Sequence, residues 1–154
     1  MRALSIRWPP LLLAALLTAC IPPGSSGPAG LMNGHLAACP DTRTCVSSED
    51  HDVSHFMPPI PYVGTRQETE AKLRAAIDSI GARITASQGD YLAVTIPQHG
   101  VVPAADLEFL FDDENQVVRF RAASRGRLGD LGENRRRIRD IELQMGVPKD
   151  RIPG

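Results

Sequence analysis

The hydrophobic positions from residue 65 onward repeat with two periods, one typical of helices and the other of strands. Apolar residues recur at helical spacing over residues 66–80 and again over residues 131–145. Each stretch follows a residue that commonly caps a helix, Thr65 and Asp130, with a glutamate three positions further on, and a glycine ends each stretch. The pattern therefore predicts one helix in each stretch.

Between these helices, hydrophobic and polar residues alternate in four stretches, 83–87, 91–96, 106–111 and 116–122. A Gln-Gly-Asp turn joins the first two stretches and an acidic loop joins the last two, so they predict two β-hairpins. The order of elements predicts an α+β fold, with both helices packed on one face of a four-stranded antiparallel sheet. An irregular, cysteine-containing N-terminal arm, residues 35–62, would precede these elements.

The second face of the predicted sheet is polar. Pairing the strands of the second hairpin across its loop sets Glu108 against Arg119 and Asp106 against Arg121. Opposite charges on facing antiparallel strands contribute about 0.2–1 kcal/mol each. The pattern leaves open whether this face is exposed to water or partly covered by the arm.

The hydrophobic stripe of the second predicted helix is interrupted. The positions three and four residues after Leu131 should be apolar but hold Asn134 and Arg135. A polar pair is therefore expected near the core-facing side of this helix, close to the corner formed by Ser124 and Arg125.

Arginine is concentrated in the same region, with eight arginines between residues 119 and 140. Guanidinium groups hold carboxylates and phosphates through paired hydrogen bonds, and the start of a helix offers backbone N–H donors. One interpretation is an anion pocket built from Arg125, Asn134, Arg135 and Arg137 at the helix start near Asp130. The alternative is that these groups satisfy one another and serve only the fold.

The first residues are typical of a targeting signal, because Arg2 and Arg7 precede an apolar run, 11–17, that is too short to span a bilayer permanently. The run ends in Leu-Thr-Ala-Cys20, which resembles a bacterial lipobox and predicts cleavage before Cys20 and its lipidation. An ordinary secretory signal is the alternative. Several acyl chains would anchor the protein stably. Ile21 follows the cysteine, and by resemblance to Gram-negative lipoproteins nothing here favours the inner membrane.

These features divide the 154-residue chain into a lipoprotein signal peptide (1–19), a flexible tether rich in Pro, Gly and Ser (20–34), a single α+β domain (35–149) and a tail (150–154). We expect the protein in the cell envelope, lipid-anchored on the periplasmic side, in the outer rather than the inner membrane of a Gram-negative cell. The formal net charge is −1, so nucleic acid is not an expected partner.

Cys39 and Cys45 are the cysteines left for the domain, and an oxidising compartment favours a disulfide between them. The small loop would contribute about 2 kcal/mol.

His51 and His55 have a spacing that suits zinc only on a helix, and nearby prolines argue against a helix, so neither a metal nor another cofactor is expected. A Cys45 nucleophile activated by His55 requires the reduced thiol.

Several separated motifs together resemble one family. They are Cys-Pro-Asp-Thr-Arg-Thr-Cys-Val-Ser-Ser from residue 39, Asp-Leu-Glu-Phe from residue 106, Arg-Ala-Ala-Ser-Arg from residue 121, and Gly-Asp-Leu-Gly-Glu-Asn-Arg-Arg-Arg-Ile from residue 129. In this order they resemble domain of unknown function 1499, over roughly Leu36 to Met145. The chain departs from the family pattern at Ala105, Ala122 and the Arg43-Thr44 pair.

The resemblance implies no biochemical activity, but it adds residues to the candidate site. The candidate binding residues are Ser47, His55, Arg121, Ser124, Arg125, Asp130, Asn134, Arg135 and Arg137. We expect a non-enzymatic envelope protein that binds an anionic small molecule, a glycan or a protein partner, and we assign no catalytic residue. The alternatives are an envelope enzyme that uses Cys45 with His55, and a purely structural envelope protein.

Overall fold

The computed structural model describes residues 27–126 and 129–151. The predicted signal peptide, Cys20 and the first part of the tether, up to residue 26, lie outside these residues, as does the end of the tail. Within the described residues, no helix has the length and apolar character that a membrane span requires.

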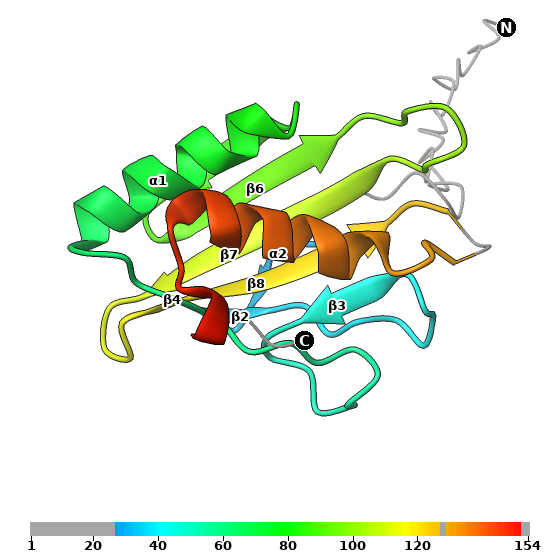
Figure 1. Ribbon diagram of the computed structural model, residues 1–154. Coiled ribbons are helices and arrows are strands. Elements are labelled where there is room, and N and C mark those ends of the chain that lie inside the picture. The colour runs from blue at the N-terminus through cyan, green and yellow to red at the C-terminus, as the bar shows by residue number, and fades with distance from the viewer. Residues whose placement is uncertain (1–26, 127–128, 152–154) are drawn as a thin grey trace, which may run out of the picture.

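Two α-helices and two antiparallel sheets make up this part of the chain (Figure 1). The small sheet pairs β1 (Leu31–Met32) with β2 (His35–Leu36). The other elements are β3 (Cys45–Ser47), β4 (Ile60–Pro61), α1 (Arg66–Ser79), β5 (Arg83–Gln88), β6 (Tyr91–Ile96), β7 (Ala105–Asp112), β8 (Val117–Ser124), α2 (Glu133–Met145) and the short 3-10 helix η1 (Lys149–Arg151).

The main sheet has six strands, so the prediction of a four-stranded sheet is wrong, although the α+β class holds. The strand order is β3-β8-β7-β6-β5, and β4 pairs with another part of β8. β3 lies against residues 121–123, and β4 lies against residues 117–118. Both additional strands are too short to show an alternating pattern. They form because the outer edge of β8 offers unpaired backbone groups to the arm that passes it.

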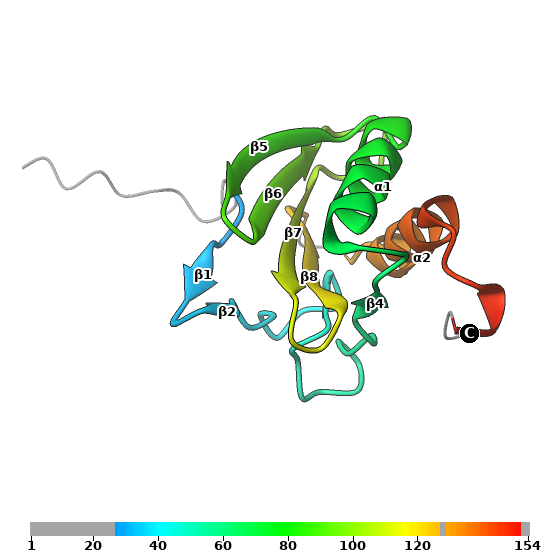
Figure 2. The ribbon, with the colours of Figure 1, turned by 90° about the vertical axis from the view of Figure 1, so that its left-hand side faces the viewer.

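Both helices cover one face of the sheet, and the arm crosses the other face (Figure 2). Fully buried side chains fill the space under the helices, among them Leu73, Ile77, Phe109, Phe120, Ile138 and Ile141. On the opposite face, the backbone N–H of Gly30 donates to Glu108 Oε1 at 2.7 Å. At this point the polar face is therefore covered by the end of the predicted tether, and Glu108 is fully buried.

Helix α1 begins as its sequence predicts. The Thr65 side chain accepts from the backbone N–H of Glu68, and the Glu68 carboxylate accepts from the N–H of Thr65, which completes a capping box. Thr69, Leu73, Ala76 and Ile77 form its buried face.

Helix α2 begins later than its hydrophobic stripe predicts. Gly132 is the N-cap in a left-handed conformation, and Leu131 has a positive φ of 53° and a fully exposed side chain. Asp130 still serves the helix start, because its carboxylate accepts from the N–H groups of Gly132 and Asn134 at 3.0 and 3.1 Å. The prediction that Leu131 faces the core is wrong, and Asn134 holds the first buried position of α2.

The β7–β8 hairpin is shifted by two residues from the predicted register. Glu108 pairs with Arg121, whereas Arg119 lies opposite Leu110. Asp112 pairs with Val117, so the loop occupies residues 113–116. Because side chains alternate with a period of two, an even shift leaves every side chain on its predicted face while changing its partner.

Candidate functional site

The predicted disulfide between Cys39 and Cys45 is confirmed, with an S–S distance of 2.07 Å and a Cα–Cα distance of 5.7 Å. It closes a loop at the start of β3, which lies near the start of α2 (Figure 1). Cys45 is buried, whereas Cys39 is partly exposed. In this state Cys45 carries no free thiol and is not a nucleophile.

Asn134 connects three segments of the fold. Its side chain is fully buried, and Nδ2 donates to the backbone oxygen of Thr44 at 2.8 Å and to Ser124 Oγ at 3.0 Å. Oδ1 accepts from Arg137 Nη1 at 3.1 Å. Arg137 Nε lies 3.2 Å from Glu133 Oε1, and burial lowers the pKa of this guanidinium. Asn134, Ser124 and Arg137 therefore belong to an internal network that fixes α2 to the cysteine loop and β8.

Two more candidate arginines lie in ion pairs on the covered face of the sheet. Arg125 binds Asp106 with two hydrogen bonds, Nε to Oδ2 at 2.9 Å and Nη2 to Oδ1 at 2.6 Å. This pairing raises the pKa of the Arg125 guanidinium. Arg121 Nη1 donates to Glu108 Oε2 at 3.0 Å, and both side chains are buried. Each of these guanidinium groups is therefore already bound by a carboxylate of the fold.

Glu108 gathers donors from three directions. Besides Arg121 and Gly30, the hydroxyl of Tyr91 donates to its Oε1 at 2.7 Å. Burial and this hydrogen bond raise the pKa of Tyr91. The buried carboxylate is thus satisfied within the fold.

Ser47 also has an internal role. Its hydroxyl donates to the backbone oxygen of Phe120 at 3.2 Å and accepts from the N–H of Glu49 at 3.1 Å. Six of the nine candidate residues therefore stabilise the fold through contacts with one another, with buried carboxylates or with the backbone. These are Ser47, Arg121, Ser124, Arg125, Asn134 and Arg137.

The other three candidates, His55, Asp130 and Arg135, line one pocket of about 300 Å³. The pocket lies between the cysteine loop and the start of α2. Its remaining lining residues are Arg43, Cys45, Val46, Ser54 and Gly132. The structure thus separates the predicted site into an internal network and a pocket that can admit a ligand.

Arg135 is held in the pocket wall by the arm. Its Nη1 donates to the backbone oxygen of Phe56 at 3.1 Å and its Nη2 to that of Ser54 at 2.6 Å. These carbonyl groups orient the guanidinium but carry no charge to compensate it. The ion pairs between described residues include neither Arg135 nor Arg43, so the pocket carries two arginines without carboxylate partners there.

Arg43 was not among the predicted site residues. Its position inside the loop that the disulfide closes was the available signal, since such a loop holds its side chains near the sulfur atoms.

The negative group in the pocket, Asp130, is engaged at the helix start by two backbone N–H groups. His55 donates from Nε2 to the backbone oxygen of Thr42 at 2.9 Å. Asp130 and His55 are therefore both engaged within the fold, which leaves the two arginines as the cations of the pocket.

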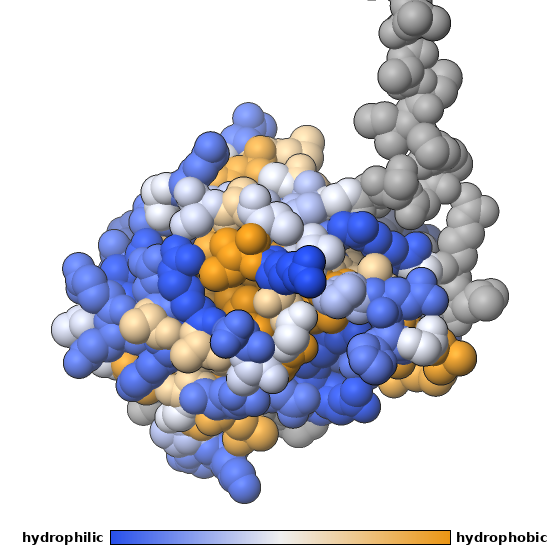
Figure 3. All heavy atoms as spheres, turned by 90° about the horizontal axis from the view of Figure 1, so that it is seen from above, coloured by the Kyte–Doolittle hydropathy of each residue, from blue (hydrophilic) through white to orange (hydrophobic). Residues whose placement is uncertain are grey.

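A larger groove of about 530 Å³ lies between the end of α1, the end of β6 and the outer side of α2. Ile80, Ile96, Pro97 and Val102 contribute apolar surface, and Arg136 is among the charged residues around it. Figure 3 shows hydrophobic surface framed by hydrophilic residues on this side of the molecule. Arg136 and Arg137 both pair with Glu133, so the arginines at this groove are compensated.

Fold and site together define a small α+β domain with two helices on an antiparallel sheet and a disulfide-closed loop beside a basic pocket. The family model described as Protein of unknown function (DUF1499) matches residues 35–145, and the chain belongs to this family. No curated protein and no solved structure matches the chain.

Proposed function

We propose that the protein is a lipid-anchored, non-enzymatic binding protein of the cell envelope. Its ligand is an anionic group, a carboxylate or a phosphate, carried by a small molecule, a glycan or a protein of the envelope. The group binds in the pocket between the cysteine loop and the start of α2, and the lipid on Cys20 holds this pocket at the membrane surface.

The orientation of Arg135 carries this proposal. Its guanidinium is fixed by the Ser54 and Phe56 carbonyl groups, so little side-chain entropy is lost when a ligand binds. Because it has no carboxylate partner among the described residues, an incoming anion does not have to displace an existing ion pair. Arg43 and Arg135 line the same pocket, which favours a bidentate or doubly charged anion.

The disulfide supports binding rather than catalysis. Among the residues that line the pocket, Cys45 is the one whose side chain could supply a strong nucleophile, and its sulfur is bonded to Cys39. The hydrogen bond of His55 to the Thr42 carbonyl directs the Nε2 proton away from a substrate. The pocket's polar groups therefore favour holding an anion over transforming it.

Isothermal titration of the purified full chain with inorganic phosphate and with succinate tests the pocket. Arg135→Gln should weaken binding of at least one anion by about tenfold or more, because hydrogen bonds to charged groups contribute about 1.5–3 kcal/mol. Arg136→Gln is the matched control. Arg136 lies one position further along α2, is 68 % exposed and pairs with Glu133, so its loss should leave binding unchanged.

The proposal fails if neither probe binds, or if the two variants bind both anions as wild type does. Equal weakening by both variants would show attraction to overall positive charge and would also contradict a specific pocket.

The anchor has a separate test in cell fractions. The wild-type protein should partition with membranes, and its N-terminal peptide should carry the mass of acyl groups on Cys20. Cys20→Ser should release the protein from the membrane fraction. A Cys20→Ser variant that remains bound to membranes without acylation would contradict the lipid anchor.

A further inference from the structure

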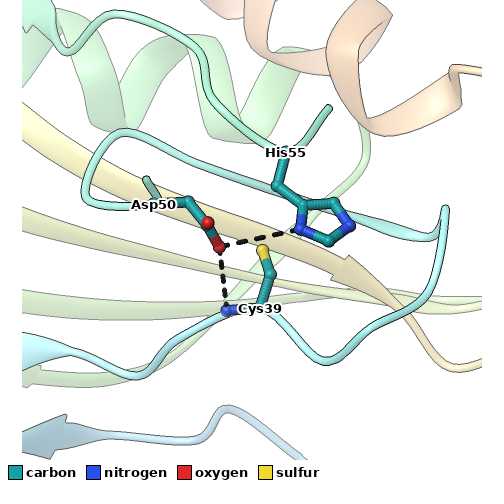
Figure 4. Close-up of side chains that lie close together, drawn as sticks. All are labelled: Cys39, Asp50 and His55. Atoms are coloured by element: carbon teal, nitrogen blue, oxygen red, sulfur yellow. Dashed lines mark hydrogen bonds and ion pairs between the residues drawn. The ribbon is translucent and has the colours of Figure 1, made fainter. Parts of the chain in front are cut away.

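A second set of ligand atoms surrounds the disulfide. Cys39 Sγ, a carboxylate oxygen of Asp50 and a ring nitrogen of His55 all lie within 4.8 Å of one another. Cys45 Sγ is bonded to Cys39 and brings a fourth donor to the same place. Figure 4 shows the three side chains Cys39, Asp50 and His55 converging from separate parts of the arm.

The imidazole ring of His55 is oriented as metal-bound histidines usually are. Nε2 lies 2.9 Å from the backbone oxygen of Thr42, and because a carbonyl only accepts, Nε2 carries the proton. In the neutral ring Nδ1 therefore presents a lone pair toward Asp50 and Cys39. Nδ1 lies 3.8 Å from Asp50 Oδ2, beyond hydrogen-bonding distance, and the side chain is 9 % exposed. Histidines that bind a metal through one ring nitrogen commonly donate from the other to a backbone carbonyl.

Asp50 is also fixed in place. Oδ1 accepts from the N–H of Asp52 at 2.9 Å, and Oδ2 accepts from the N–H of Cys39 at 3.3 Å. Its side chain is 13 % exposed. These bonds hold Oδ2 on the side that faces His55 and the sulfur atoms.

The distances suit a tetrahedral zinc ion. With zinc bonds of about 2.0–2.3 Å, tetrahedral ligand atoms lie about 3.3–3.8 Å apart. Nitrogen and oxygen ligands fall at the short end of this range, so Asp50 Oδ2 and His55 Nδ1, now 3.8 Å apart, have to approach by about 0.4 Å. The two sulfur atoms have to separate to about 3.8 Å, which reduction of their bond permits.

We propose that, when the disulfide is reduced, Cys39, Cys45, Asp50 and His55 bind one zinc ion. Zinc accepts thiolate, imidazole and carboxylate ligands, whereas magnesium and calcium do not favour the two thiolates and the imidazole. Cys45 and His55 also line the neighbouring pocket, but zinc binding does not require an anion there. His51, the other histidine of this segment, is exposed and takes no part.

The reaction balances with a thiol reductant. Two external thiols reduce the S–S bond and form their own disulfide, while Cys39 and Cys45 each gain a proton. Zinc binding then displaces both protons as the thiolates bind the metal. The loop that carries Arg43 is thus closed either by a disulfide or by zinc.

Cobalt(II) is a suitable probe, because its bonds to thiolates give intense near-ultraviolet bands and a tetrahedral site gives strong visible bands. The purified full chain should show no such bands while oxidised. After anaerobic reduction with a phosphine, it should bind one cobalt ion per chain with thiolate bands, and zinc should abolish them. Zinc should also raise the melting temperature of the reduced protein and leave that of the oxidised protein unchanged.

Variants identify the ligands. His55→Ala and Asp50→Asn should each weaken cobalt binding by about tenfold or more, because even the loss of a group that only orients a metal ligand has an effect of this size. His51→Ala is the control on the same segment and should bind as wild type does. Each variant is first examined as the oxidised form by circular dichroism, so that loss of the fold is recognised separately.

Two results would overturn the proposal. One is reduced wild-type protein that shows no cobalt–thiolate bands. The other is cobalt binding with thiolate bands that are the same in His55→Ala, Asp50→Asn and His51→Ala, which would place the metal on the cysteines alone.

Discussion

Replacing Asn134 by alanine should destabilise the domain strongly, because this side chain makes three internal hydrogen bonds at a fully buried position. Arg135, the next residue along α2, contacts backbone carbonyl groups at exposed positions. The two neighbours therefore provide a matched comparison between a residue of the internal network and a residue of the pocket.

The expected loss follows from the partners of Asn134. Each hydrogen bond contributes about 1 kcal/mol net, and the bond from the charged Arg137 contributes somewhat more. The Thr44 carbonyl keeps one partner, the N–H of Ser124 at 2.9 Å, so it is not left without a donor. Arg137 keeps its contact with Glu133. These remaining contacts limit the loss, and we expect about 3 kcal/mol for Asn134→Ala and less than about 1 kcal/mol for Arg135→Ala.

Urea unfolding of both variants, followed by circular dichroism with the disulfide intact, measures these values. Both variants should keep the wild-type m-value, since the same surface is exposed on unfolding. Asn134→Asp fills the same volume but cannot donate to the Thr44 carbonyl, so it should remain clearly destabilised. A loss below about 1 kcal/mol for Asn134→Ala, or an equal loss for Arg135→Ala, would refute the division into network and pocket.

Two further substitutions test other parts of the fold. Burial raises the pKa of Glu142 from 4.5 to about 7, so the folded state holds a proton that the unfolded chain releases, and stability should fall as the pH rises through this window. The free energy of unfolding of Glu142→Gln, measured with urea, should therefore exceed that of the wild type by roughly 1–3 kcal/mol at pH 8 and by little at pH 4. An equal gain at both pH values would contradict this cause. Arg125→Ala leaves the buried carboxylate of Asp106 without its ion pair and should cost about 2 kcal/mol, less than a fully buried pair because Arg125 is 32 % exposed. Asp106→Asn added to this variant should recover part of the loss in thermal unfolding, and no loss in Arg125→Ala alone would show that the pair contributes nothing.

Elements with a long periodic pattern were predictable from the sequence, and elements that depend on a neighbour were not. The capping box at Thr65 and the alternation of hydrophobic and polar residues over 83–122 are local signals, and the structure has helix α1 and strands β5 to β8 at these places. β3 and β4 have three and two residues, too few to establish a period. They are strands only because β8 pairs with them, and this pairing joins residues about 60 to 80 positions apart in the sequence.

The same limit applies to the start of α2. Leu131 and Asn134 are three positions apart, and on a continuous helix they would lie on one face. Gly132 instead adopts a left-handed conformation, and the helix begins after it. Leu131 consequently turns to the solvent, while Asn134 takes the buried position. A hydrophobic pattern cannot show this change, because the backbone conformation of a single glycine decides which residue begins the stripe.

Which polar residues of α2 belong to the internal network and which to the pocket depends on contacts that a sequence pattern does not contain. Asn134 and Arg135 are adjacent, but on a helix their side chains point about 100° apart, so one enters the core and the other reaches the pocket. One partner of Asn134 is Thr44, 90 positions away, and the partners of Arg135 are about 80 positions away. Because the arm supplies Thr44 and both partners of Arg135, the same segment that completes the internal network also orients the cation of the pocket. A ligand bound at Arg135 therefore lies beside the residue of α2, Asn134, that joins this helix to the cysteine loop through Thr44.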